Sequence, residues 1–345
     1  MNFMYMFPLL AVLVLMLLAY IGAGACGLQS FFGIVIPYLA LLTFLVGFAR
    51  RIMGWASSPV PFRIPTTCGQ EKSLPWIKAN RIDNPDTLLG VIARVFLEVV
   101  CFRSLFRNTK NELHGGKKLI HSWEIWLWVF ALAFHYSFLV VILRHLRFFI
   151  EPVPFCVKAL EFFDGFLKIE YVDNILQIGL PGIYLSGLVL LGALIFLLLR
   201  RMIIPQVKYI SLAADFFPLF LIIAIACTGI YMRYFSKVDI VGIKELTMGL
   251  VTFHPAIPEG MGAVFFVHFF LVSVLLAYIP FSKLMHIGGV FLSPTRNLVN
   301  NSRIKRHINP WNDEFKMPNH TYEEYEDEFR EKMVEAGLPV DKELK

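Results

Sequence analysis

The chain has 345 residues, of which 57% are hydrophobic and only 17% are charged, against roughly 25% charged residues in a soluble domain. This composition excludes an ordinary soluble enzyme and indicates a membrane protein. Apolar runs of about 20 residues recur, long enough to cross the hydrocarbon core as helix, and they do not alternate in polarity as barrel strands do. The net charge of +6 is attributed to Lys and Arg on the cytoplasmic side, and no nucleic-acid partner is expected.

Six membrane spans are expected, because six apolar runs reach membrane length and are separated by polar or charged segments. The predicted fold class is therefore an all-α integral membrane protein, a six-helix transmembrane bundle with a cytoplasmic C-terminal tail. The apolar runs cover residues 4–22, 31–49, 123–147, 175–199, 210–232 and 262–285.

The charges between the spans indicate their direction. Residues 51–120 contain eleven Lys and Arg against five Asp and Glu, whereas residues 148–174 contain two against five. Positive charge is retained on the cytoplasmic side of membrane proteins. Both termini and the long 51–120 loop are therefore predicted to be cytoplasmic.

Within that loop, residues 87–107 are apolar but are interrupted by Arg94, Glu98, Arg103 and Arg107. Spacings of four to five residues place these charges on one broad stripe of a helix. The segment therefore predicts an interfacial amphipathic helix on the inner membrane face. The alternative, a short seventh span, would bury several charges.

The C-terminal tail becomes acidic and helical from Tyr322 to Gly337, and acidic residues suit the N-terminal turn of a helix. Two interpretations stay open for this helix, a solvated helix and a docking tail for a soluble partner. The chain is expected to have four parts. They are two N-terminal spans (1–50), the cytoplasmic loop (51–120), a four-helix part (121–286) and the cytoplasmic tail (287–345).

Four histidines lie in or at the end of the apolar runs, where ionisable side chains are rare and usually functional. His135 and His145 are ten residues apart on the third run, and His268 and His286 are eighteen apart on the sixth. Because these two runs cross the membrane in opposite directions, His145 is expected to face His268 and His135 to face His286. Each pair of neutral imidazoles matches the axial ligands of one haem iron. The sequence thus predicts two haems, and no C-x-x-C-H motif is present to attach them covalently.

Helical geometry supports this pairing only in part. Eighteen residues make five turns, so His268 and His286 are expected to share one face of a single helix. The rises are unequal, ~15 Å between the histidines of the third run and ~27 Å between those of the sixth. Pro280 lies between the second two histidines and is expected to kink that helix and absorb the difference.

Other roles for the histidines stay open at this point. A membrane histidine can simply be hydrogen-bonded to a neighbouring helix. A proton relay would require a buried carboxylate, for which Asp215 comes closest. A secondary transporter would show inverted repeats, and none is found. A structural membrane anchor with incidental histidines is the remaining alternative.

The histidine spacing resembles that of the nitrate reductase gamma-subunit type of cytochrome b, and this resemblance covers the third to sixth spans. The whole chain looks more like the DsrM-type cytochrome b subunits of the membrane complex associated with dissimilatory sulfite reduction. The phrases SSPVPFRIPTTCGQEKSLPWIK, FRSLFRNTK and GLVTFHP carry that resemblance. The chain is also similar to the cytochrome b subunit of membrane-bound heterodisulfide reductase.

The resemblance implies a di-haem cytochrome b of the inner (cytoplasmic) membrane that exchanges electrons between menaquinol or menaquinone and a cytoplasmic iron–sulfur subunit. It further implies another membrane subunit and a multihaem cytochrome c in the same respiratory complex of sulfur metabolism. In this family the quinone lies near the outer haem, which His145 and His268 would hold. The candidate propionate or quinone contacts are Arg144, Arg147 and Lys283, and His254 is a weaker candidate for a quinone contact.

Overall fold

The computed structural model describes residues 4–58, 80–107, 109–115, 118–165, 183–293, 295–300 and 321–342. The backbone divides into two compact units. The larger, here called the membrane bundle, comprises residues 1–53 and 93–292, and the smaller comprises residues 54–92 and 293–345.

Among the described residues, six helical stretches are long and apolar enough to cross a membrane, which confirms the predicted all-α membrane bundle. The fourth begins at Leu185, ten residues later than predicted, after Pro181 and Gly182, two residues that disfavour helix. The six long helices are α1 (Met6–Gly24), α2 (Ile36–Ala56, preceded by the π-helical turn Phe31–Val35), α5 (Ile125–His145), α7 (Leu185–Ile203), α9 (Ala213–Tyr231) and α11 (Ala263–Tyr278).

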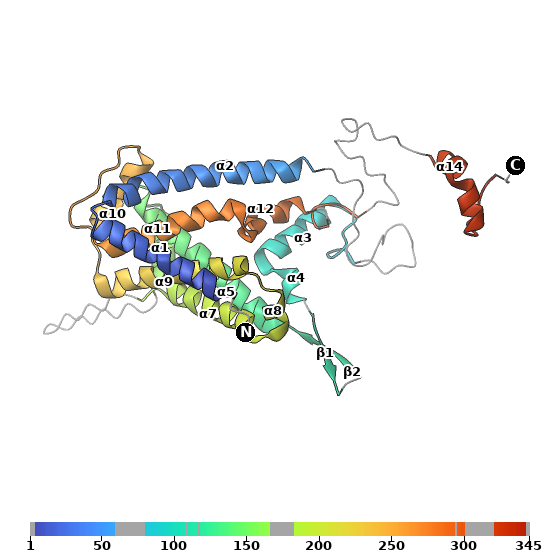
Figure 1. Cartoon of the computed structure of the whole chain (residues 1–345), viewed down its shortest axis with the longest axis horizontal. Helices are drawn as coiled ribbons and strands as arrows, with labels where there is room; N and C mark the ends of the chain where they lie inside the picture. The colour runs from blue at the N-terminus through green and yellow to red at the C-terminus, as the bar shows by residue number, and fades with distance from the viewer. Residues whose placement is uncertain are drawn as a thin grey trace. The chain divides into compact units, whose positions relative to one another are not determined.

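The centre of the membrane bundle is formed by α1, α9 and α11, which all pack on one another, while α7 packs between α9 and α5 (Figure 1). Their contact surfaces carry large apolar side chains such as Phe32, Leu194, Leu221 and Phe266, all almost completely buried. Over their described lengths, the backbones of α5 and α11 do not pack closely on each other. These are the two helices that carry three of the four candidate histidines.

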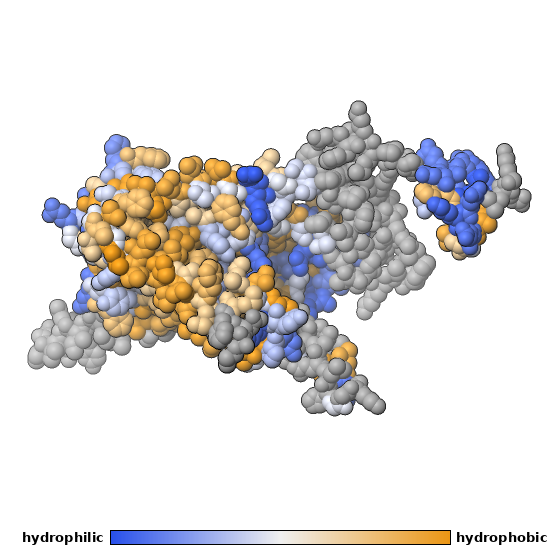
Figure 2. Space-filling model, in the orientation of Figure 1, coloured by the Kyte–Doolittle hydropathy of each residue, from blue (hydrophilic) through white to orange (hydrophobic). Residues whose placement is uncertain are grey.

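Apolar side chains also cover the outside of the membrane bundle, as Figure 2 shows. Long rows of leucine and valine on α1 and α2 are exposed, among them Leu13, Leu17, Leu42 and Val46. Soluble proteins rarely expose apolar patches of this extent. This surface is suited to contact with lipid acyl chains.

We expect the substitution Gly22→Ala to destabilise the crossing of α1 with the turn before α2. A methyl group at Gly22 would overlap the buried Phe32 ring, and overpacking of this kind costs about 1–3 kcal/mol. Thermal unfolding in detergent measures the loss. Gly187→Ala on α7 is the matched control, because a methyl group there would have no atom within 4 Å; equal losses in both variants would contradict the packing argument.

The predicted amphipathic segment forms two helices instead of one, α3 (Leu88–Cys101) and α4 (Arg103–Phe106). The chain breaks at Phe102, whose φ of 51° lies in the left-handed region. The last carbonyls of α3 accept hydrogen bonds from α5, from Trp128 Nε1 to Cys101 O and from Tyr136 Oη to Val100 O, each 2.8 Å. These bonds satisfy carbonyls that a helix end leaves without partners, so α3 ends there.

A β-hairpin precedes α5 and was not predicted. Strand β1 (Thr109–His114) pairs antiparallel with β2 (Lys118–Trp123), and Gly115 in the connection has a φ of 59°. The predicted start of the third span, residue 123, agrees with the structure to within two residues. His121 lies in β2, and α5 begins at Ile125.

Shorter helices connect the spans. Helix α6 (Phe155–Asp164) follows α5, α8 (Pro205–Ile210) follows α7, and α10 (Ile240–Val251) follows the π-helical turn Met232–Ser236. The chain after α11 forms the 3-10 turns Ile279–Phe281 and Lys283–Met285, the short helix α12 (His286–Gly289) and the 3-10 turn Val290–Leu292.

The smaller unit contains the acidic tail helix α14 (Tyr322–Glu335), which confirms that the tail is helical. Thr321 caps it, with its hydroxyl accepting from Glu324 N while the Glu324 carboxylate accepts from Thr321 N. Glu326 is buried, and backbone N–H groups from Asp341 and Lys342, together with Arg330, hold the pKa of its carboxyl below the usual range. The end of the chain is thus folded back onto α14.

Candidate functional site

The sixth span is interrupted before it reaches His286, which corrects the expectation that His268 and His286 share one face of one helix. α11 ends at Tyr278, and Pro280 follows directly. Proline lacks the N–H that would continue the helix, and Ser282 is fully extended with φ −122° and ψ 177°. His286 is therefore carried by a separate segment.

His135 of α5 and His286 of α12 nevertheless lie next to each other. Their ring centroids are 5.9 Å apart, with the ring planes 81° to each other. Phe102 and Phe134 also contact the His135 ring edge-on, with centroid distances of 4.8 and 4.7 Å. The His135–His286 pair thus sits beside aromatic side chains at the end of α3.

The second pair is formed by His145 at the end of α5 and His268 on α11. Thr228 of α9 contacts His268 Nδ1 through Oγ1 at 2.9 Å. The next residue, Gly229, has no side chain, and a methyl group there would lie 3.3 Å from His268 Cε1. α9 therefore approaches the His268 ring closely.

All four imidazoles have Nδ1 engaged by an oxygen atom. A carbonyl only accepts, so it fixes the proton on Nδ1 and leaves Nε2 as the free lone pair. The Thr228 hydroxyl already donates to Ala224 O, so it too accepts from its histidine. The carbonyl partners are Ala131 for His135 and Val141 for His145, both at 2.7 Å, and Lys283 for His286 at 2.9 Å. Metal-bound histidines have this arrangement, in which the second nitrogen donates to a fixed acceptor.

The residues fit a haem iron held from two sides. A metal–imidazole bond is about 2 Å long, so imidazoles on opposite faces of one iron have ring centres roughly 6 Å apart. The separation of His135 and His286 agrees with this value. In the described part of the chain, no group of three or more His, Cys, Asp or Glu side chains converges on one point. The described residues therefore provide pairs of histidines and no cluster of three or more metal-binding side chains.

If a haem binds between His145 and His268, the substitution Thr228→Val should weaken its retention. Valine has the same shape but accepts no hydrogen bond, and loss of such a supporting partner typically costs about 10–100-fold in metal-site affinity. Transfer of haem to an added scavenger apoprotein measures the change. Thr228→Ser keeps the hydroxyl and should behave as the wild type; the same rapid loss from both variants would contradict this role of the hydroxyl.

A buried polar cluster lies next to His145. Arg144 forms an ion pair with Asp164, and Asp164 also accepts from the backbone N–H and the hydroxyl of Ser186, at 2.7 and 2.6 Å. The guanidinium of Arg144 lies 3.5 Å from the centre of the Tyr184 ring, and that of Arg233 lies 4.0 Å from it. Two cations thus share one aromatic ring beside one carboxylate.

Arg233 is a candidate that the sequence did not single out. Its buried Nε has no hydrogen-bond partner among the residues that the structure describes. A buried unpaired donor beside a surplus positive charge is suited to an anionic or carbonyl oxygen. The only feature of the sequence that could have identified Arg233 is its position directly after the fifth apolar run, which carries none of the predicted ligands.

The remaining predicted contacts are engaged elsewhere in the structure. Arg147 pairs with Glu161 of α6 at 2.8 Å, and Lys283 pairs with Asp215 of α9 at 2.7 Å. His254 is exposed and contacts the Thr252 carbonyl through Nδ1. His307 and His320 lie outside the described residues.

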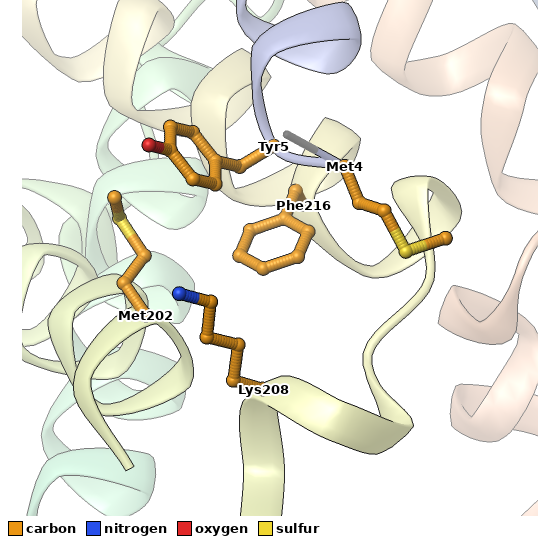
Figure 3. A pocket seen from close by; sticks show the side chains of 5 residues that line it. All are labelled: Met4, Tyr5, Met202, Lys208 and Phe216. Atoms are coloured by element: carbon orange, nitrogen blue, oxygen red, sulfur yellow. The ribbon is translucent and has the colours of Figure 1, made fainter. Parts of the chain in front are cut away.

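A hollow at the start of α1 lies apart from the histidines. Figure 3 shows the Lys208 ammonium group ending beside Met202, with the Phe216 ring and Tyr5 above it. Its lining comes from the chain before α1, from α7 and α8, and from the start of α9, and it includes none of the four histidines. The lining residues are Met4, Tyr5, Met202, Lys208 and Phe216.

Residues 118–307, more than half of the chain, match the family model described as nitrate reductase gamma subunit. The chain belongs to this family. The match includes all four histidines and begins after α2, so the first two spans lie outside it. The family thus accounts for α5 through α12, the part of the membrane bundle that holds both histidine pairs.

Two relatives extend the likeness over most of the chain. Both carry the name Hdr-like menaquinol oxidoreductase cytochrome b-like subunit. The relative from Archaeoglobus fulgidus is 44% identical over 287 residues, which is 81% of this chain and 83% of the relative. The relative from Archaeoglobus profundus is 40% identical over 289 residues, 82% of this chain and 83% of its own length.

Proposed function

We propose that this chain is the cytochrome b subunit of a respiratory complex that exchanges electrons with the menaquinol/menaquinone pool. The observation that carries the proposal is the presence of two facing imidazole pairs, each with Nδ1 held and Nε2 free. The names of the two Archaeoglobus relatives support the same activity.

In this proposal the chain binds two b-type haems, one between His145 and His268 and one between His135 and His286. Bound there, such groups supply one-electron transfer through the membrane. The four histidines would hold the two irons, each imidazole is oriented by the acceptor of its Nδ1 hydrogen bond, and apolar side chains such as Phe102, Phe134 and Phe148 lie against the His135 and His145 rings.

Arg144 and Arg233, which lie over the Tyr184 ring, are proposed to bind oxygen atoms of the quinone or of the haem propionates beside His145. Arg233 offers an unpaired buried Nε among the described residues, and Arg144 is held in place by Asp164 and Ser186. Arg147 and His254 stay candidates for the quinone. Lys283 stays a candidate for the propionates of the haem between His135 and His286, and its ammonium group pairs with Asp215.

The finer assignments follow the resemblance. The complex is proposed to serve dissimilatory sulfur metabolism, in the manner of the DsrM-type subunits, with a cytoplasmic iron–sulfur subunit, a further membrane subunit and a multihaem cytochrome c as partners. The Lys- and Arg-rich 51–120 loop and the basic beginning of the 287–345 tail orient both termini to the cytoplasm. These two segments are the proposed docking region for the iron–sulfur subunit, and α14 is part of it.

A dithionite-reduced minus oxidised visible spectrum of the purified full-length chain tests the proposal. Two b-type haems per chain that are also reduced by a soluble menaquinol analogue would support it. Absence of any haem band, in protein that is folded by circular dichroism, would overturn it in favour of a transporter or an anchor. Haem that never accepts electrons from the quinol would overturn the menaquinol assignment alone.

A further inference from the structure

The segment that carries His286 has little internal support. It consists of 3-10 turns of three residues each and the four-residue helix α12, separated from α11 by the extended Ser282. Short 3-10 turns contain few hydrogen bonds, and their geometry is poor. Contacts with other helices must therefore fix where the His286 imidazole lies.

Lys283 provides the first of these contacts, through both its backbone and its side chain. Its carbonyl accepts from His286 Nδ1 at 2.9 Å, and its ammonium group donates to Asp215 Oδ1 at 2.7 Å. The other carboxylate oxygen of Asp215 accepts from Leu212 N at 3.0 Å, which caps α9, and Arg201 lies 3.6 Å from it. Asp215 is only 7% exposed, so it is a fixed anchor for the residue that orients His286.

Helix α2 provides the second contact, on both sides of His286. A methyl group at Gly47 would lie 2.7 Å from Pro280 Cβ, so the α2 backbone touches the start of the segment. A methyl group at Gly288 would lie 2.6 Å from Ile52 Cδ1, so α2 also touches the turn that follows His286. Figure 1 shows α2 running alongside α11 and α12. The two glycines allow this close approach because they carry no side chain.

We infer that Asp215 and the face of α2 that contains Gly47 hold His286 in position. Neither touches an iron ligand directly; Asp215 acts through Lys283, and Gly47 acts through Pro280. The inference rests on the proposed function, since it assumes that His286 binds a haem iron. According to this inference, α2 helps to position His286, although it lies outside the residues matched to the family.

The test compares two variants in the purified full-length chain, Asp215→Asn and Gly47→Leu. Lys283 is 74% exposed, so removal of its partner leaves no buried charge and the fold should persist. Both variants should lose one of the two haems to a scavenger apoprotein about 10–100-fold faster, the range seen for lost supporting contacts. The redox potential of that haem should shift, and the other haem should keep its potential and its rate of loss.

Controls separate positioning from general damage. Asp215→Glu retains the carboxylate and should restore the wild-type rate. Gly192→Leu on α7 makes the same change as Gly47→Leu at an exposed position, where an added methyl group would have no atom within 4 Å, and it should leave both haems unchanged. Equal disturbance of both haems in Asp215→Asn, or of either haem in Gly192→Leu, would overturn the inference.

His286→Ala distinguishes failure of the inference from failure of the proposed function. If His286→Ala removes one haem while Asp215→Asn and Gly47→Leu leave both unaffected, the positioning inference is wrong and the function stands. If His286→Ala leaves the haem content unchanged, the assignment of His286 as a ligand is wrong, and the inference falls with it.

Discussion

Replacement of His145 by alanine should remove one of the two haems and abolish reduction by menaquinol, while the other haem stays bound. In the proposed arrangement His145 and His268 would be the two protein ligands of this iron, and a lone imidazole would hold it far less well. The haem content by the pyridine haemochrome method and the difference spectrum measure the loss. The exposed His254 is the control, and His254→Ala should retain the full haem content.

Double variants then test the pairing itself. His145→Ala with His268→Ala should match His145→Ala alone, because both changes remove the same site. His145→Ala with His286→Ala should leave no haem, because each change removes a different site. One haem retained in this second combination would show that His145 and His286 share one site. No haem left in the first combination would show that the histidines are paired along each span and not across the membrane bundle.

The substitution Asp164→Ala should destabilise the protein by about 3–5 kcal/mol, because it leaves a charge buried without its partner. Arg144 and Asp164 are only 12% and 6% exposed, so water does not replace the lost contact. Asp164 also accepts from Ser186 N at the start of α7, and that bond is lost as well. Thermal unfolding in detergent, followed by circular dichroism, measures the effect.

Two comparisons show whether the buried charge is the cause. Arg144→Met combined with Asp164→Leu removes both charges and should recover much of the stability, since a buried pair replaced by apolar residues is often neutral. Glu161→Ala breaks the more exposed pair with Arg147 and should cost about 1 kcal/mol or less. If Asp164→Ala is as mild as Glu161→Ala, the ion pair is solvated and contributes little.

Most of the fold follows from the sequence because a membrane imposes a simple rule, which is that every span must be a long apolar helix. The predictions from sequence that are wrong lie where the local backbone conformation, and not hydropathy, determines the structure. Pro280 ends α11 and detaches the segment that carries His286, although the sequence suggested only a kink. The hairpin before α5 was missed, although the glycines at 115 and 116 between two short strands are a recognisable turn signal.

Chain direction predicts which histidines face each other across antiparallel spans, and their pairing as haem ligands stays a prediction. The residues that support the histidines could not be predicted. Thr228 and Gly229 lie on α9, which has no histidine, and their contact with His268 depends on how α9 and α11 pack. The stacking of Arg144 and Arg233 on Tyr184 likewise joins three separate helices or their ends, and no spacing in the sequence encodes it.

Phe102 holds a left-handed backbone conformation that a bulky residue adopts at a cost of order 1–3 kcal/mol. Glycine would adopt it freely, yet glycine would expose the edge of the His135 imidazole that the Phe102 ring now covers. If His135 binds iron as proposed, the cost of this backbone conformation is offset by the cover that Phe102 gives to an iron ligand. Orthologues that retain both histidine pairs should keep an aromatic residue here, and lineages that have lost His135 should drift toward glycine or asparagine.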